Sequence, residues 1–244
     1  MAVIDSMKNM MLRQSSKIVS NVVRKADIDQ LATLFWTLSK LAKEPAKSGL
    51  RKLAEGAENH DPMLMNWSEL FKKSEPKVVE KIISNLIINE FAIGEKVRQD
   101  LMHEHQTVLP KLGVISPTYA CNLRCVGCYA ALYGHKYMLS KEEIFDVIKQ
   151  FNDLGIYFFI ITGGEPFVYP YLFDVLEHFK DSYFLIYTNG TLVTEENAKK
   201  MAELGNSTLA ISIEGFEEMT DWRRGKGVFD KIKNAWEILT KYKL

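Results

Sequence analysis

Cysteine is scarce in this chain of 244 residues, and its three cysteines all lie within one short stretch. Clustered thiols do not make the disulfide framework of a secreted protein, which indicates a reducing, intracellular setting. Net charge is also lacking, because 31 Lys and Arg residues balance 31 Asp and Glu residues, so bulk electrostatics predicts no nucleic-acid partner. The sequence shows no apolar run long enough to span a bilayer and no signal-peptide pattern. We therefore expect a cytoplasmic protein.

Residues 1–107 are expected to form a small all-α domain. Apolar residues recur at helical spacing between Ile28 and Leu41, and again between Val78 and Ile87. Basic and apolar residues alternate over 17–25 in the pattern of an amphipathic helix, which is more often docked on its own domain than on a membrane surface. Peripheral membrane contact is therefore the less favoured alternative. Turn chemistry predicts helix breaks near Glu44-Pro45, at Gly56, over 58–62 and over 74–76.

From residue 108 onward, apolar runs of strand length alternate with helical patterns. The expected strands are 112–116, 156–162, 183–188 and 208–213, and the expected helices are 140–151, 171–180, 194–205 and 228–241. Ser140 and Glu143 form a capping box at the start of the first of these helices. Four βα units predict an α/β fold with a parallel sheet, wound in one sense by right-handed crossovers.

Candidate binding residues follow each expected strand. Ligands of parallel α/β sheets bind beyond the C-terminal ends of the strands, so these residues should share one rim. Glycine after a strand is by itself weak evidence, but four such motifs in register are hard to obtain by accident. The segments are the cysteine loop 116–134, Gly163-Gly164-Glu165-Pro166, Thr188-Asn189-Gly190-Thr191, and Ser212-Ile213-Glu214-Gly215.

The cysteines Cys121, Cys125 and Cys128 have the spacing C-x3-C-x2-C. A [4Fe–4S] cluster fully ligated by protein takes four thiolates, so three would leave one iron open. A zinc site would need a nearby fourth ligand, and the closest histidine, His135, lies seven residues beyond Cys128. A redox pair of Cys125 and Cys128 would leave Cys121 unexplained. The compact spacing also disfavours three scattered buried thiols.

From Leu112 to the end, the chain resembles the radical SAM superfamily in its cysteine loop, its GGEP motif and its SIEG motif. The resemblance implies a partial (β/α) TIM-like barrel, here its first four βα units, preceded by the small all-α domain. It also implies a site-open [4Fe–4S] cluster on Cys121, Cys125 and Cys128, with S-adenosyl-L-methionine chelating the open iron. Reductive cleavage of that cofactor would give a 5′-deoxyadenosyl radical, which abstracts hydrogen from an unidentified substrate.

The resemblance further implies roles for individual residues. Gly163, Gly164, Glu165 and Pro166 would hold the methionine amino group of the cofactor, with the glycines letting it approach bare backbone. Ser212 and Glu214 would face its ribose and carboxylate, and Thr188 and Asn189 would line the same cavity.

Arg224 lies in a stretch, 220–229, that resembles the subgroup bearing SPASM or twitch extensions, where this arginine pairs with the cofactor carboxylate. The family usually has an aromatic residue before the third cysteine, but this chain has Gly127 there. Tyr129 is the expected substitute for its adenine contact. No residue is identified as a catalytic acid or base.

The resemblance also implies what lies outside these motifs. The family's barrel normally has six βα units, so residues 108–244 would be a domain incomplete at its C-terminus, in a truncated chain. A reductant protein such as ferredoxin or flavodoxin would supply the electron, and the substrate would be a peptide or a complex metabolite. The alternative from another class is a non-enzymatic iron–sulfur protein for electron transfer or sensing.

Overall fold

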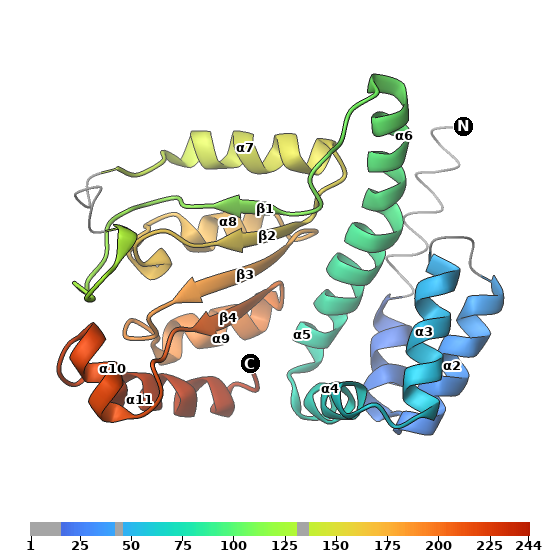
Figure 1. Cartoon of the computed structure of the whole chain (residues 1–244), viewed down its shortest axis with the longest axis horizontal. Helices are drawn as coiled ribbons and strands as arrows, with labels where there is room; N and C mark the ends of the chain where they lie inside the picture. Colours follow the sequence, from blue (N-terminus) through green and yellow to red (C-terminus); the bar gives the residue numbers. More distant parts are fainter. Residues whose placement is uncertain (1–15, 42–45, 131–136) are drawn as a thin grey trace.

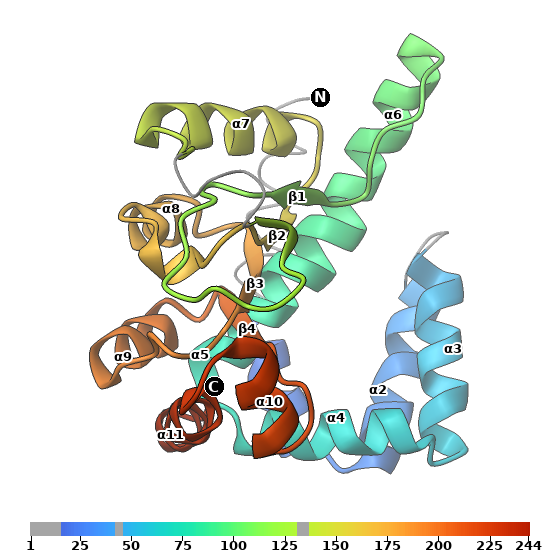
Figure 2. The same cartoon turned by 60° about the vertical axis from the view of Figure 1, so that its left-hand side comes forward.

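The computed structural model describes residues 16–41, 46–130 and 137–244. Its C-terminal half is a parallel sheet covered by helices, and its N-terminal half is helical (Figure 1 and Figure 2). This arrangement confirms the α/β fold class expected from the alternating pattern. The division of the chain into two domains at residue 107 stays a prediction. Within the described residues, no helix combines the length and apolarity needed to cross a membrane.

Helices make up most of the N-terminal half. They are α2 (Ile28–Leu41), α3 (Ala46–Glu58), α4 (Pro62–Lys73), α5 (Pro76–Lys81), the π-helix η1 (Ile82–Gly94) and α6 (Glu95–His105), after a helix over 16–25. The expected breaks over 58–62 and 74–76 are confirmed, because α4 begins and ends there. Asp61 caps α4 by accepting hydrogen bonds from the Met63 and Leu64 amides (2.8 and 3.3 Å).

One expected helix break is wrong, and another cannot be compared. Gly56 lies inside α3, because an isolated glycine weakens a helix without having to end it. The break expected near Glu44-Pro45 falls outside the described residues. The helix over 16–25 packs Val19 and Val23 against the helical core and leaves Ile18 exposed. It is therefore docked on its own half of the chain through one face.

The sheet contains four parallel strands in the order β1-β2-β3-β4. The strands are β1 (Gly113–Ile115), β2 (Phe158–Ile161), β3 (Tyr183–Thr188) and β4 (Ser207–Ile211), each within the expected run or one residue of it. The register aligns Val114, Ile160, Leu185 and Thr208 in one row across the sheet. All four C-terminal ends therefore reach the same edge, as the sequence predicted.

Connecting helices cover one face of the sheet. They are α7 (Lys141–Asp153), α8 (Leu172–His178), α9 (Glu195–Leu204) and α11 (Val228–Lys241). The Ser140–Glu143 capping box is present, with its two hydrogen bonds at 2.7 and 3.1 Å. Two short helices were not expected, the 3-10 helix η3 (Pro166–Val168) and α10 (Glu217–Arg224). The residues of α10 are mostly polar, so the sequence has no apolar stripe that would predict this helix.

The two faces of the sheet differ in burial. Ile115, Phe159, Ile161 and Ile186 alternate along the strands and form the core with α7 and α8. Their neighbours in sequence point to the opposite face. Val114 is 60% exposed there, so this face is open within the described residues.

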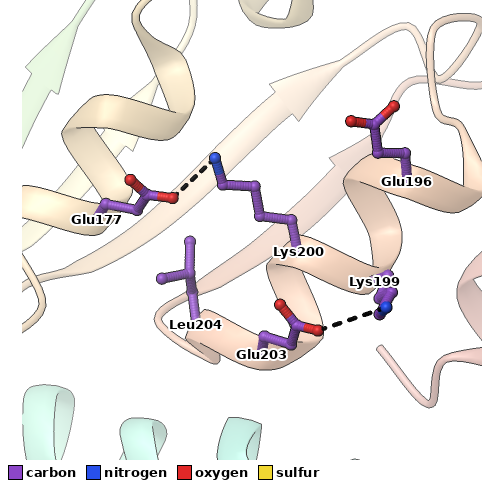
Figure 3. Close-up of a pocket in the computed structure, with 6 residues that line it drawn as sticks. All are labelled: Glu177, Glu196, Lys199, Lys200, Glu203 and Leu204. Carbon is purple, nitrogen blue, oxygen red and sulfur yellow. Dashed lines mark ion pairs between the residues drawn. The ribbon is translucent and has the colours of Figure 1, made fainter.

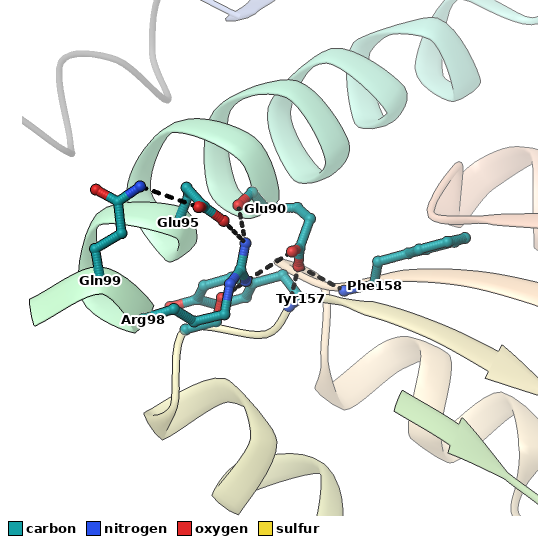
Figure 4. A network of polar contacts seen from close by, with 7 residues as sticks. Glu90, Glu95, Arg98, Gln99, Tyr157 and Phe158 are labelled. Atoms are coloured by element: carbon teal, nitrogen blue, oxygen red, sulfur yellow. Dashed lines mark hydrogen bonds and ion pairs between the residues drawn. The ribbon is translucent and has the colours of Figure 1, made fainter. Parts of the chain in front are cut away.

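A buried ion pair docks the helical half on the start of the sheet. The carboxylate of Glu90 in η1 accepts hydrogen bonds from the amides of Tyr157 and Phe158, at the beginning of β2 (2.6 and 3.1 Å) (Figure 4). Arg98 in α6 pairs with Glu90 at 2.7 Å and donates to the Gly155 carbonyl at 2.5 Å. Both charged side chains are only 2% exposed. The helix η1–α6 thus crosses the end of the sheet opposite the rim that carries the candidate site (Figure 1).

Candidate functional site

The cysteine loop follows β1 at the C-terminal rim of the sheet. Cys121, Cys125 and Cys128 are half-buried free thiols. Burial raises the pKa of the Cys121 thiol, and burial likewise raises the pKa of the Cys125 thiol, against the opposing charge of Arg224. Binding iron as thiolates would therefore release protons.

The three thiols suit a cluster better than a single metal ion. Among the described residues, no three His, Cys, Asp or Glu side chains are arranged to hold one ion. A [4Fe–4S] cluster makes a different demand, because each thiolate binds its own iron. His135, the nearest histidine in sequence, lies outside the described residues. The donor set therefore fits an iron–sulfur cluster.

The loop after β2 lies directly against the cysteine loop. The Gly164 amide donates to the Thr118 carbonyl, and the Glu165 amide donates to the Ala120 carbonyl, both at 2.8 Å. A Cβ at Gly164 would overlap the Ala120 carbonyl and lie 2.6 Å from the carbonyl oxygen of Tyr119. Gly164 thus lacks a side chain where the cysteine loop packs against it. This requirement for glycine could not be seen in the sequence.

Glu165 joins the ends of β2 and β3 from a fully buried position. One carboxylate oxygen accepts from the Thr188 hydroxyl (2.7 Å) and from the Phe167 amide (3.1 Å). The other accepts from the Asn189 amide N–H (2.8 Å). Burial raises the pKa of Glu165, and these hydrogen bonds oppose the rise. Its carboxylate is therefore engaged by the chain itself.

Residues at the end of β3 form hydrogen bonds with the beginning of the cysteine loop. The Asn189 side-chain amide donates to Cys121 Sγ at 3.8 Å and to Asn122 Oδ1 at 2.9 Å. Asn122 in turn donates to the Thr191 hydroxyl at 2.8 Å. A second N–H donor to Cys121 Sγ is the Leu123 backbone amide, at 3.4 Å. The strand end and the loop are thus joined at Cys121.

Helix α10 contacts the second half of the cysteine loop through Arg223, and it carries a second arginine, Arg224, beside it. The Val126 amide donates to the Arg223 carbonyl at 2.8 Å, and Arg223 Nε donates to the Val126 carbonyl at 3.3 Å. Arg223 and Arg224 both pair with Glu214, Arg224 at 2.5 Å. These arginines lower the pKa of Glu214 and oppose the burial effect on Cys125. Positive charge therefore lies close to the cysteines.

The structure brings all the predicted site residues to one rim. Tyr129 is 53% exposed, and its hydroxyl donates to the Gly163 carbonyl at 3.4 Å. Ser212 donates its backbone N–H to the Thr188 carbonyl at 2.9 Å. Pro166 is buried and opens η3. Sequence reasoning missed Asn122 and Arg223, although the adjacent Arg223-Arg224 pair was a visible signal for the second of these.

A hollow between α8 and α9 is separate from this rim (Figure 3). Its lysines are paired with glutamates, Lys200 with Glu177 at 2.7 Å and Lys199 with Glu203 at 3.9 Å. The hollow lies in the layer of helices and is lined mostly by charged side chains that pair with one another, as on an ordinary solvent-exposed surface. Its lining residues are Glu177, Glu196, Lys199, Lys200, Glu203 and Leu204.

The family model of the radical SAM superfamily matches residues 115–244, more than half of the chain. The match covers most of the parallel sheet and the cysteine loop at its rim, and the chain therefore belongs to the radical SAM superfamily. This is a family of enzymes that use a [4Fe–4S] cluster and S-adenosylmethionine.

Individual relatives match only part of the chain. Fe-coproporphyrin III synthase of Methanosarcina barkeri is 36% identical over 118 residues, which cover 46% of this chain and 30% of that protein. Mycofactocin maturase MftC of Mycolicibacterium smegmatis is 32% identical over 127 residues, covering 50% of this chain and 32% of that protein. A solved structure of anSMEcpe with bound AdoMet and Cp18Cys peptide is 25% identical, with a TM-score of 0.48, over 54% of this chain and 40% of that one. The chain thus spans about a third of the length of the curated relatives it matches.

Proposed function

We propose that Cys121, Cys125 and Cys128 hold a [4Fe–4S] cluster whose open iron binds S-adenosylmethionine. The observation that carries the proposal is the hydrogen-bonded rim, in which the loop after β2, the loop after β3 and helix α10 all form hydrogen bonds to the cysteine loop. Held by these three cysteines, a reduced cluster would supply the electron for reductive cleavage of S-adenosylmethionine, the chemistry from which hydrogen abstraction by a 5′-deoxyadenosyl radical would follow.

The rim residues divide into those that contact the cofactor and those that support the loops. Backbone oxygens of Gly163 and Gly164 remain the proposed partners of the cofactor's amino group. Glu165 is proposed to hold these glycines in place and not to contact the cofactor, because its carboxylate already accepts three hydrogen bonds from the chain. Pro166 fixes the turn that follows, as the first residue of η3. Thr188, only 2% exposed, acts with Glu165 as a support.

The remaining contacts come from the loop after β4 and from Tyr129. Arg224 is proposed to share its guanidinium between Glu214 and the cofactor carboxylate, since a planar guanidinium can serve two carboxylates. Ser212, half-buried at the same rim, is proposed to face the ribose. Tyr129 exposes half of its surface beside Gly163 and is the proposed adenine contact.

The proposed substrate is a complex metabolite or a peptide, and the proposed electron donor is a reductant protein such as ferredoxin or flavodoxin. Relatives named as a porphyrin synthase and a maturase support a large substrate. Membership of an enzyme family disfavours the alternative of an iron–sulfur protein that only transfers electrons or senses.

Single replacement of each cysteine by alanine tests the ligand assignment. After anaerobic reconstitution, each of Cys121→Ala, Cys125→Ala and Cys128→Ala should lose the cluster's visible absorbance and most of its iron, because no other cysteine is present in the sequence. Val126→Ala is the matched control, since Val126 lies in the same loop with an exposed side chain. Full iron retention in any one cysteine variant would rule out that cysteine as a ligand.

A further inference from the structure

The hydrogen-bond network fixes the orientation of the Asn189 amide. The Thr191 backbone N–H can only donate, and it donates to Asn189 Oδ1 at 2.9 Å. The amide nitrogen must therefore point the other way, toward Cys121 Sγ and Asn122 Oδ1. The side-chain nitrogen and oxygen of Asn189 are therefore assigned from the Thr191 donor, and not only from where the two atoms are placed.

Asn122 and Thr191 complete a closed ring around this amide. Asn122 accepts from Asn189 and donates to the Thr191 hydroxyl, and that hydroxyl donates back to Asn189 Oδ1 at 2.7 Å. Asn189 is only 7% exposed, so water has little access to replace these partners. The ring holds an N–H donor against a sulfur that also accepts from the Leu123 amide.

Hydrogen bonds to cysteine sulfur change the redox properties of a cluster. An N–H donor stabilises negative charge on the thiolate, and the reduced cluster carries more of that charge than the oxidised one. The donor therefore raises the reduction potential. A higher potential makes the cluster easier for a protein reductant to reduce.

From this geometry we infer that Asn189 is a positioning residue of the cluster, which holds the cysteine loop and raises the cluster's reduction potential through Cys121 Sγ. The inference rests on the proposed function, because it assumes that this loop binds a [4Fe–4S] cluster. It differs from the cavity-lining role that the family resemblance implies for Asn189. Asn122 and Thr191 keep the Asn189 amide in place.

Two substitutions of Asn189 test the inference in the full chain. Asn189→Leu removes the donor at similar volume, and Asn189→Asp keeps the acceptor for Thr191 while removing the N–H. Each variant should lose reconstituted iron or titrate at a more negative midpoint potential, measured by EPR-monitored redox titration. Asn206→Leu is the matched control, because Asn206 is a buried amide that bonds the Leu176 and Phe179 carbonyls just before β4 begins, away from the rim.

The outcomes separate this inference from the proposed function. If the unmodified chain reconstitutes no [4Fe–4S] cluster, the proposed function fails and the inference fails with it. If the unmodified chain holds the cluster but both Asn189 variants keep its iron content and potential, only the inference is overturned. An equal change in Asn206→Leu would also overturn it, because the effect would then reflect general destabilisation. Changes confined to the Asn189 variants support it.

Discussion

At the scale of single residues, the site depends on close approach between its own loops. Gly164 and the cysteine loop pack backbone against backbone, and Glu165 joins two strand ends from a buried position. Residues that resemble cofactor contacts in the sequence therefore also shape the cysteine loop. Substituting these residues should therefore lower the amount of cluster that assembles, in addition to any effect on cofactor binding.

Gly164→Ala should destabilise the protein and reduce its iron content. Its Cβ would overlap the Ala120 carbonyl, and overpacking of this kind costs about 1–3 kcal/mol. Gly49→Ala is the control, because nothing lies within 4 Å of its Cβ position in α3, and a helical alanine should stabilise by roughly 0.5–1 kcal/mol. Urea unfolding and iron analysis measure both effects. Normal iron content in Gly164→Ala would contradict the packing described here.

Glu214 should make stability depend on acid pH. Hydrogen bonding to Arg224 lowers its pKa from the ordinary value of 4.5, so its contribution is fully present above that pH and is lost as pH falls through the lowered pKa. Glu214→Gln should therefore unfold at a lower temperature at pH 7, with the difference shrinking as the pH falls. Glu237→Gln, an exposed carboxylate of α11, is the control. A difference that is constant with pH would disprove this linkage.

The sequence predicted the candidate residues but not most of their contacts. The cysteine spacing and the motifs after each strand are local patterns, and the shared direction of parallel strands brings them to one rim. The partners of Asn189 and the brace from Arg223 to Val126 join segments distant in sequence. Such contacts depend on loop conformation, which no local pattern specifies. Burial of Glu165 could not be predicted for the same reason.

At the scale of elements, η1 and α6 form one continuous helix that packs against the N-terminal ends of the strands. Asn85 in η1 donates to the Lys180 and Ser182 carbonyls (2.9 and 2.8 Å), just before β3. The apolar pattern predicted helix here. The π-helical hydrogen bonding of η1 was not predictable, because π- and α-helices have similar apolar spacing in a short segment.

Glu90→Gln should destabilise the protein strongly. Replacing the Glu90 carboxylate by an amide leaves the buried Arg98 charge with only the more exposed Glu95 as its ionic partner, and breaking a buried ion pair costs about 3–5 kcal/mol. Adding Arg98→Met to Glu90→Gln should recover part of that loss. Glu95→Gln is the control, because Glu95 pairs with the same guanidinium while 20% exposed and should cost less. Urea unfolding of the four proteins measures this, and equal losses in Glu90→Gln and Glu95→Gln would argue against the buried pair as the docking contact.

At the scale of the whole molecule, the two ends of the sheet differ in what lies against them. Helix η1–α6 covers the end where the strands begin, and the cysteine loop lies at the end where they finish (Figure 1). The α/β fold class and the parallel strand direction followed from the alternating sequence pattern, because buried parallel strands and crossover helices leave strong signals. Among the described residues, the open face of the sheet exposes Val114 and Tyr187 in part.

The most direct test of the account is the EPR spectrum of the reduced, reconstituted protein with and without S-adenosylmethionine. A cluster held by three cysteines has one iron open to the cofactor, so adding S-adenosylmethionine should change the spectrum. Decarboxylated S-adenosylmethionine, which lacks the carboxylate, should change it much less. An identical spectrum before and after adding S-adenosylmethionine at saturating concentration would contradict the central claim.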